Sequence, residues 1–196
     1  LFRSLLCRSH ALWTRYAARG NVMQLFEQVG VAYRDTDTNR VNALGKLEHK
    51  TERDASNAAA GALASRAWIA SLHADWHPSR PWWTTGHLAG KWQRDTLEHG
   101  VRSSFKAALA SGRVVYDISE RWDIGALAAV MAGQHGARQT ALGVEIGYQL
   151  ATNLWLSAGF NATGFKADAD LAGYEYTQRG TYLRLRFKFD EKLFQR

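Results

Sequence analysis

Leu142-Gly143-Val144-Glu145-Ile146-Gly147-Tyr148-Gln149-Leu150 alternates strictly between two kinds of side chain. The even positions carry Leu, Val, Ile, Tyr and Leu, whereas the odd positions carry Gly, Glu, Gly and Gln. Successive side chains of a β-strand point to opposite faces, so this stretch has one apolar face and one small or polar face. A helix would spread both kinds around its circumference. The stretch therefore predicts a β-strand.

The same period of two recurs along the chain, and it is sharpest in the segment Tyr-Leu-Arg-Leu-Arg-Phe-Lys-Phe at 182–189. The alternation predicts ten strands. We place them at 9–17, 23–34, 40–52, 66–77, 82–94, 103–117, 122–132, 139–150, 154–165 and 178–189. The first is the weakest, and the Ala-rich stretch 55–65 is interpreted as a loop rather than a short helix.

The lengths of the connections give a second signal. The short ones are 35–39, 78–81, 118–121 and 151–153, and the longer ones are 53–65, 95–102, 133–138 and 166–177. Short and longer connections therefore alternate along the chain. Membrane barrels have short periplasmic turns and long outer loops, whereas a soluble sandwich has no reason for such an order.

Aromatic residues gather at the end that carries the short turns. The predicted girdle consists of Trp76, Trp82, Trp83, Tyr116, Trp122, Tyr148, Trp155, Phe187 and Phe189, although the phase of its strand turns Trp155 inward. Trp and Tyr favour the headgroup level of a bilayer, where an apolar ring and a polar tip are both satisfied. Two separate observations thus select the same end as periplasmic.

We therefore expect an all-β protein, a closed antiparallel transmembrane β-barrel of about 10 strands in the cell outer membrane, with 8 or 12 strands as alternatives. Residues 1–196 would form one domain, with 1–20 weakly assigned and 190–196 as a periplasmic tail. The structural alternative is a soluble barrel or sandwich that buries the same apolar face inward. Because Leu1 is not an initiator, we expect a processed chain or a fragment.

The composition excludes several classes of protein. The single cysteine, Cys7, leaves no internal disulfide or cysteine zinc site, and no apolar run is long enough for a transmembrane helix. The formal charge of +7 is compatible with nucleic acid, with anionic lipid or with an enclosed basic interior. Basic residues do not interleave with aromatics on an exposed face, so no nucleic-acid partner is expected.

The last strand carries a recognisable pattern, Gln178-Arg179-Gly180-Thr181-Tyr182-Leu183-Arg184-Leu185. It resembles the C-terminal β-signal of Gram-negative outer-membrane proteins at Gln178, Gly180, Leu183 and Leu185. The resemblance implies recognition by the outer-membrane barrel assembly machinery. It departs from the usual signal because residues 186–196 follow it.

More broadly, 111–194 resembles the barrels that close the C-termini of large repeat-bearing surface proteins of Gram-negative bacteria. The resemblance rests on the stretches 112–118, 122–125, 153–159 and 182–191, and more loosely on 33–40. It implies a membrane anchor or translocator for a passenger upstream. Two other functions stay open: a small pore, and an adhesin or receptor formed by the loops 53–65, 95–102 and 166–177.

The predicted phase turns charged residues into the barrel interior. They are Lys46, Glu48, Lys50, Lys91, Asp123, Glu145, Arg184, Arg186 and Lys188. One interpretation is a salt-bridged interior that holds the strands in register. The other is an anion-preferring pore lined by the basic residues of the last strand.

No cofactor or metal is expected, although weaker signals point to zinc or nickel binding, to proton sensing and to calcium binding. His73 and His87 are predicted to lie opposite each other, where they could bind zinc or nickel or sense protons. Asp168 and Asp170 give a weak calcium signal. Ser71 and Ser157 face the predicted interior, but no Ser-His-acid set is evident there, so no enzymatic activity is expected.

Overall fold

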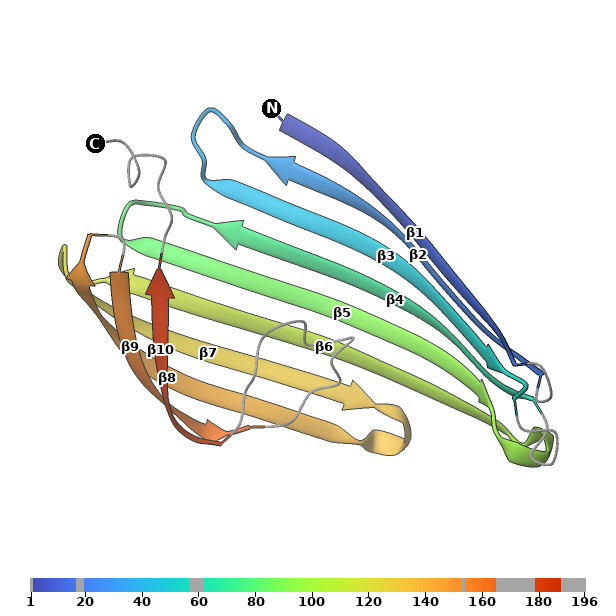
Figure 1. Cartoon of the computed structure of the whole chain (residues 1–196). Helices are drawn as coiled ribbons and strands as arrows, with labels where there is room; N and C mark the ends of the chain where they lie inside the picture. The colour runs from blue at the N-terminus through green and yellow to red at the C-terminus, as the bar shows by residue number, and fades with distance from the viewer. Residues whose placement is uncertain (1, 17–19, 57–61, 153, 165–178, 188–196) are drawn as a thin grey trace.

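The computed structural model describes residues 2–16, 20–56, 62–152, 154–164 and 179–187. In this part of the chain, one antiparallel sheet contains ten strands in sequence order (Figure 1). The strands are β1 (Phe2–Tyr16), β2 (Gly20–Arg34), β3 (Val41–Asp54), β4 (Leu63–Trp76), β5 (Trp82–Thr96), β6 (Arg102–Asp117), β7 (Trp122–Gly133), β8 (Arg138–Ala151), β9 (Leu154–Thr163) and β10 (Gly180–Phe187). The predicted all-β class and strand number are confirmed.

The registers show which residues share a face of the sheet. Residues directly opposite each other in an antiparallel pair point to the same side. For example, Glu145 is opposite Gly125 on β7 and Gly159 on β9, and Gly125 is opposite Val115 on β6. Followed across all ten strands, these pairs divide the side chains into one mostly apolar face and one face that carries most of the charges, here called the apolar face and the polar face.

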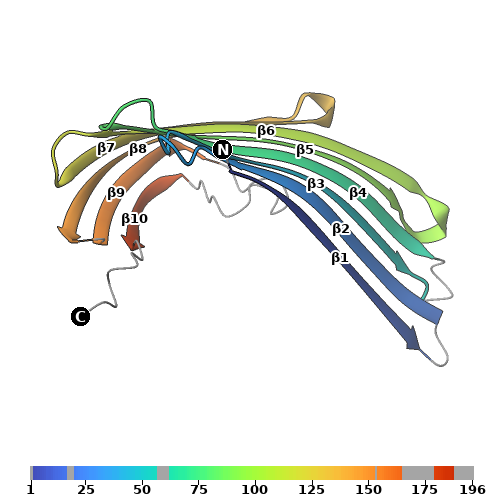
Figure 2. The ribbon, with the colours of Figure 1, turned by 90° about the horizontal axis from the view of Figure 1, so that it is seen from above.

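The sheet is strongly curved, as the view from above shows (Figure 2). Side chains of strands that are not neighbours meet on the polar face: Arg113 of β6 and Tyr182 of β10 both contact Glu145 of β8. Such contacts form where a sheet bends toward its own side chains. The polar face is therefore the concave one.

The apolar face is convex and exposes large hydrophobic side chains. They include Leu72, Leu88, Val144, Ile146, Leu183 and Leu185, each between 46% and 76% exposed. A soluble monomer rarely exposes apolar area on this scale. In the described part of the chain, no helix is long and apolar enough to cross a membrane.

Barrel closure is not seen in the described residues. β1 and β10 are the two edges of the sheet, and no register joins them. β10 spans Gly180–Phe187, which is much shorter than β1. The sheet is thus an open, curved wall in this part of the chain, and closure stays a prediction.

Most of the predicted girdle residues lie on the apolar face near the short turns. Trp82 packs against Tyr116 with 4.8 Å between ring centroids, and Trp122 packs against Tyr148 at 4.7 Å. Trp76 lies on the same face, at the end of β4.

Two other girdle residues lie on the polar face: Trp83, contrary to its assignment, and Trp155, in agreement with the inward phase predicted for it. Trp83 follows Trp82 directly, so the pleat turns it to the polar face, and Trp155 is opposite Arg186 on that face. Phe187 occupies an apolar-face position in the register, and Phe189 lies outside the described residues.

The prediction of strictly alternating connection lengths was also wrong. The connections at 95–102 and 133–138 are tight turns, because the flanking strands extend further than predicted. Each turn contains a His-Gly pair in the left-handed region, with φ of 58° and 76° at His99-Gly100 and 59° and 75° at His135-Gly136. The first strand also begins earlier than predicted, at Phe2.

The turn between β2 and β3 is organised by the carboxylate of Asp35. Oδ1 accepts the backbone N–H groups of Asp37 and Thr38, both at 3.2 Å, and Oδ2 accepts the hydroxyl of Thr38. These bonds favour the charged carboxylate, and the hydroxyl of Thr38 is the largest cause of the lowered pKa of Asp35.

We therefore expect this turn to lose its carboxylate hydrogen bonds at acid pH. A folded-state pKa below the unfolded value gives stability that is complete above the unfolded value and disappears as pH falls through the folded value. In a carboxyl-carbon NMR titration, Thr38→Val should raise the pKa of Asp35. Thr36→Val removes a hydroxyl that donates to Asp37 instead, so it should raise the pKa of Asp35 less; equal effects would contradict this account.

Candidate functional site

Eight of the nine charged residues predicted to line the interior share the polar face. They are Lys46, Glu48, Lys50, Lys91, Asp123, Glu145, Arg184 and Arg186. Lys188 lies outside the described residues. The structure brings together Asp123, Glu145, Arg184 and Arg186, whereas the other four are on β3 and β5.

Glu145 is the centre of this group. Its side chain is 3% exposed, and its Oε1 accepts two N–H groups of Arg113, with Nε at 2.9 Å. Its Oε2 accepts the hydroxyl of Tyr182 at 3.0 Å and lies 3.7 Å from Nη1 of Arg184. The glutamate thus links β6, β8 and β10, and a buried carboxylate with these partners is far more stable than an unpaired one.

A second ion pair lies beside it. Arg186 Nη2 is 3.7 Å from Asp123 Oδ2, and Asp123 is almost fully buried. Together, Arg113, Arg184 and Arg186 face two carboxylates. Arg113 was not among the residues predicted to line the interior, although its odd position in the predicted strand 103–117 gives it the same phase as Val115, on the polar face.

Glycines make room for these side chains. A Cβ on Gly125 would lie 2.8 Å from Cγ of Glu145, and one on Gly147 would lie 2.8 Å from Cγ of Asp123. A Cβ on Gly159 would overlap the ring of Tyr182. The charged side chains therefore lie across neighbouring strands where those strands have no side chain of their own.

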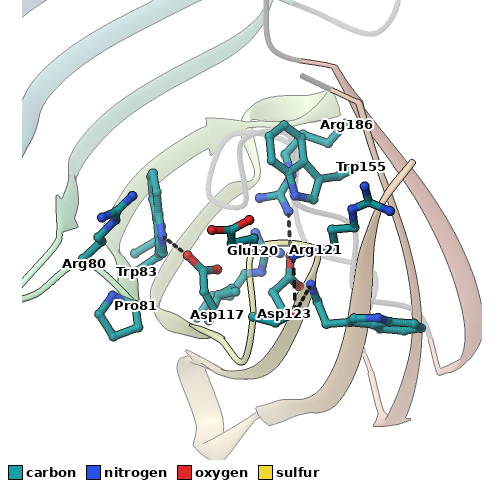
Figure 3. A pocket seen from close by; sticks show the side chains of 14 residues that line it. Arg80, Pro81, Trp83, Asp117, Glu120, Arg121, Asp123, Trp155 and Arg186 are labelled. Atoms are coloured by element: carbon teal, nitrogen blue, oxygen red, sulfur yellow. Dashed lines mark hydrogen bonds and ion pairs between the residues drawn. The ribbon is translucent and has the colours of Figure 1, made fainter. Parts of the chain in front are cut away.

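A cavity of about 550 Å³ opens beside this cluster, at the end of the sheet with the 118–121 turn (Figure 3). Trp83 donates its indole N–H to Asp117 Oδ2 at 3.1 Å in its wall. Its lining carries four arginines and three carboxylates: Arg80, Arg113, Arg121, Arg186, Asp117, Glu120 and Asp123. The cavity is polar and slightly cationic.

The polar face is not charged throughout. A band of small residues crosses β4 to β8: Ala67, Ala89, Ala107, Ala129 and Ala141. Leu109 packs with four members of this band, Ala89, Ala107, Ala129 and Ala141. The wall thus combines a charged zone with an apolar zone.

His73 lies opposite His87 as the sequence predicts, with 6.1 Å between ring centroids, and His73 Nε2 is 3.6 Å from Asp75. Among the described residues, no group of three or more His, Cys, Asp or Glu is placed to hold a metal ion. The hypothetical calcium ligands Asp168 and Asp170 lie outside those residues.

The assembly-signal residues are partly described. Gly180 begins β10, and Leu183 and Leu185 point outward on the apolar face, where they are 76% and 66% exposed. Gln178 lies outside the described residues. Recognition by the assembly machinery stays a prediction.

Comparisons with known proteins give one likeness. No protein-family model matches the chain, and no curated protein matches it. A solved structure of the porin NanC aligns with 96% of this chain and 97% of its own, at a TM-score of 0.48 and 12% sequence identity. The resemblance to repeat-bearing surface proteins also stays a prediction.

The first prediction from this site concerns Glu145. Glu145→Gln should lower the free energy of unfolding by about 3 kcal/mol, because Arg113 and Arg184 lose the charge they share. Glu48→Gln is the control, since its partner Lys46 is 35% exposed and such a pair contributes below about 1 kcal/mol. Urea unfolding followed by tryptophan fluorescence compares them, and equal losses would reject the central role of Glu145.

The second concerns the glycines. Gly125→Ala should destabilise the fold by about 1–3 kcal/mol, because the new methyl group displaces Glu145. Gly45→Ala adds a methyl group to an apolar-face site with nothing within 4 Å, so it should be neutral or stabilising by about 0.5 kcal/mol. The same unfolding experiment checks both, and a neutral Gly125→Ala would contradict the packing described.

Proposed function

We propose that this chain is an outer-membrane β-barrel whose polar face lines a narrow pore with a preference for anions. The observation that carries the proposal is the separation of side chains between the two faces of the sheet. Large apolar residues are exposed on the convex side, and ion-paired charges are gathered on the concave side. This arrangement is the reverse of a soluble barrel and suits a lipid exterior with a polar interior.

The dimensions of the apolar face support a membrane location. Basic residues lie on this face beyond the apolar zone, ten or twelve positions along the strand from the aromatic girdle. The pairs are Trp76 and Arg66, Trp82 and Arg94, Tyr116 and Lys106, and Tyr148 and Arg138. At about 3.3 Å per residue and a tilt near 40°, the separation is about 25–30 Å, the thickness of a hydrocarbon layer.

The charged cluster supports the anion preference. Three arginines share two carboxylates on the part of the polar face formed by β6 to β10, and Arg80 and Arg121 add to the lining of the nearby cavity. Arg184 is 40% exposed, so its charge is available to a passing ion. The ion pairs also hold the strands in register, so the salt-bridged interior and the anion-preferring pore are compatible interpretations.

The closed barrel is part of this proposal. The convex apolar surface and the curvature of the sheet favour closure, because an open edge in lipid leaves backbone groups unpaired. A heat-dependent shift in gel mobility of the detergent-extracted chain, with a β-rich circular dichroism spectrum, tests it. No shift, in a chain that is soluble without detergent, would overturn it. The anchor or translocator role has no residue in the described structure that carries it, and it stays a prediction.

Ion selectivity tests the pore. In planar bilayers with a KCl gradient, the double substitution Arg184→Gln and Arg186→Gln should move the reversal potential toward the cation side, because the cluster loses its excess positive charge. The control is Arg94→Gln with Arg138→Gln, which removes the same charge from the apolar face. An unchanged reversal potential in the first variant, or an equal change in both, would reject the role of the cluster.

A further inference from the structure

One acidic residue lies on the apolar face instead of the polar face. Glu27 of β2 lies on the apolar face, and it is the one acid on that face among the described strands. It is six positions from Tyr33, which places it within the zone that we assign to lipid. Ionisable groups at such a depth are costly, so their presence points to a function.

Glu27 belongs to a chain of three polar side chains. His49 Nδ1 lies 3.1 Å from Glu27 Oε2, and His49 Nε2 lies 3.2 Å from the hydroxyl of Thr51. A carboxylate can only accept, so it selects the tautomer with the proton on Nδ1, which leaves Nε2 to accept the proton of the hydroxyl. This order of hydroxyl, imidazole and carboxylate is that of an activated nucleophile.

The position of the imidazole is fixed on a third strand. The ring of His49 stacks on Trp68 of β4, with 4.4 Å between centroids and 25° between planes. The indole is 45% exposed and gives an apolar surface beside the three polar groups. A stacked ring with both nitrogens engaged has the fixed orientation that a general base requires.

The surroundings define a class of substrate. Arg66 is directly opposite Thr51 in the register, Arg94 is opposite Arg66, and Arg53 is two positions further along β3 from Thr51. All three arginines are exposed on the apolar face. In a membrane lipid, the acyl ester lies just below the phosphate, so lipid phosphate at this basic row would place the ester beside Thr51.

We infer that Glu27, His49 and Thr51 form a hydrolytic site on the outer surface of the sheet, specific for acyl esters of phosphate-bearing lipids. The inference rests on the membrane location proposed above. Thr51 is the nucleophile, His49 is the base, and Glu27 is the positioning residue. The site is independent of the concave face, and it departs from the expectation that the chain has no enzymatic activity.

The reaction balances with water as the second reactant. Thr51 Oγ1 attacks the carbonyl carbon while His49 Nε2 takes the hydroxyl proton, and the carbonyl oxygen gains a negative charge that Arg66 is placed to balance. The intermediate collapses, the ester bond breaks, and the departing alcohol takes the proton from His49. Water then attacks the acyl-threonine in the same way and releases the fatty acid, which restores the hydroxyl of Thr51.

The experiment measures fatty acid released by the purified full chain. The chain is reconstituted in phosphatidylglycerol vesicles, and the products are quantified by mass spectrometry. Thr51→Val, which keeps the shape of the side chain, and His49→Gln should each lower the rate by about 100-fold or more. Thr51→Ser should keep it. Treatment with a long-chain alkyl fluorophosphonate should add its mass to the peptide containing Thr51.

Thr140→Val is the matched control. Thr140 is exposed on the same face and lies two positions from Arg138, but it has no histidine beside it in the register. Its substitution should change neither release nor labelling. Release by the unmodified chain that is no faster than by Thr51→Val would overturn the inference, as would an equal loss in Thr140→Val.

Substrates with and without phosphate test the specificity. Arg94→Gln should slow release from phosphatidylglycerol more than from diacylglycerol presented in the same vesicles, because Arg94 belongs to the basic row but has no role at the carbonyl oxygen. Equal effects would overturn the phosphate assignment. A separate experiment with lipid A micelles distinguishes lipid A from a phospholipid as the source of the phosphate-bearing ester. Failure of this site leaves conductance intact, whereas failure of the membrane proposal abolishes the gel shift and conductance as well.

Discussion

The antiparallel hydrogen-bond register is the constraint on which the other features depend. It runs through ten strands with irregularities only at two points between β8 and β9 among the described pairs. Because the pleat has a period of two, the register assigns each residue to one face, and an error of one residue would exchange the faces. Glu145 can be shared by Arg113 and Tyr182 only because all three have the same phase.

The charged cluster also depends on glycines in neighbouring strands, which leave room for its long side chains. Glu145 lies over Gly125, Asp123 over Gly147, and Tyr182 over Gly159. Each long polar group therefore crosses a strand at a point where that strand presents only backbone. Glycine weakens a strand in isolation, but here it permits ion pairs between strands that are not neighbours. The glycines thus lower the local propensity for strand formation, and the ion pairs that they permit stabilise the sheet instead.

The phase of the strands could be predicted from the sequence because alternation is a local property. This was confirmed for the stretch 142–150 and for the eight charged interior residues that the structure describes. The loop lengths could not be predicted, since His99-Gly100 and His135-Gly136 close turns in the left-handed region while the strands extend around them. Trp83 was assigned to the girdle because it lies next to a short turn, although its phase in the strand points to the polar face.

The contact between Glu27 and His49 was missed for a different reason. The two residues are 22 positions apart in the sequence, and only the register between β2 and β3 brings them together. His49 and Thr51 are two positions apart, which places them on the same outer face, but this spacing alone does not indicate Glu27. His73 and His87 lie opposite each other as predicted but gain no third metal ligand among the described residues, and Asp168 and Asp170 lie outside that part of the chain.

The alanine band of the concave wall has a consequence for how the proposed pore could diversify. Ala67, Ala89 and Ala129 lie on the concave face and take part in none of its ion pairs. In the pore that we propose, width and charge are therefore set by separate groups of residues. Larger side chains within the band would narrow that pore without changing its ionic preference, so the two traits could evolve independently.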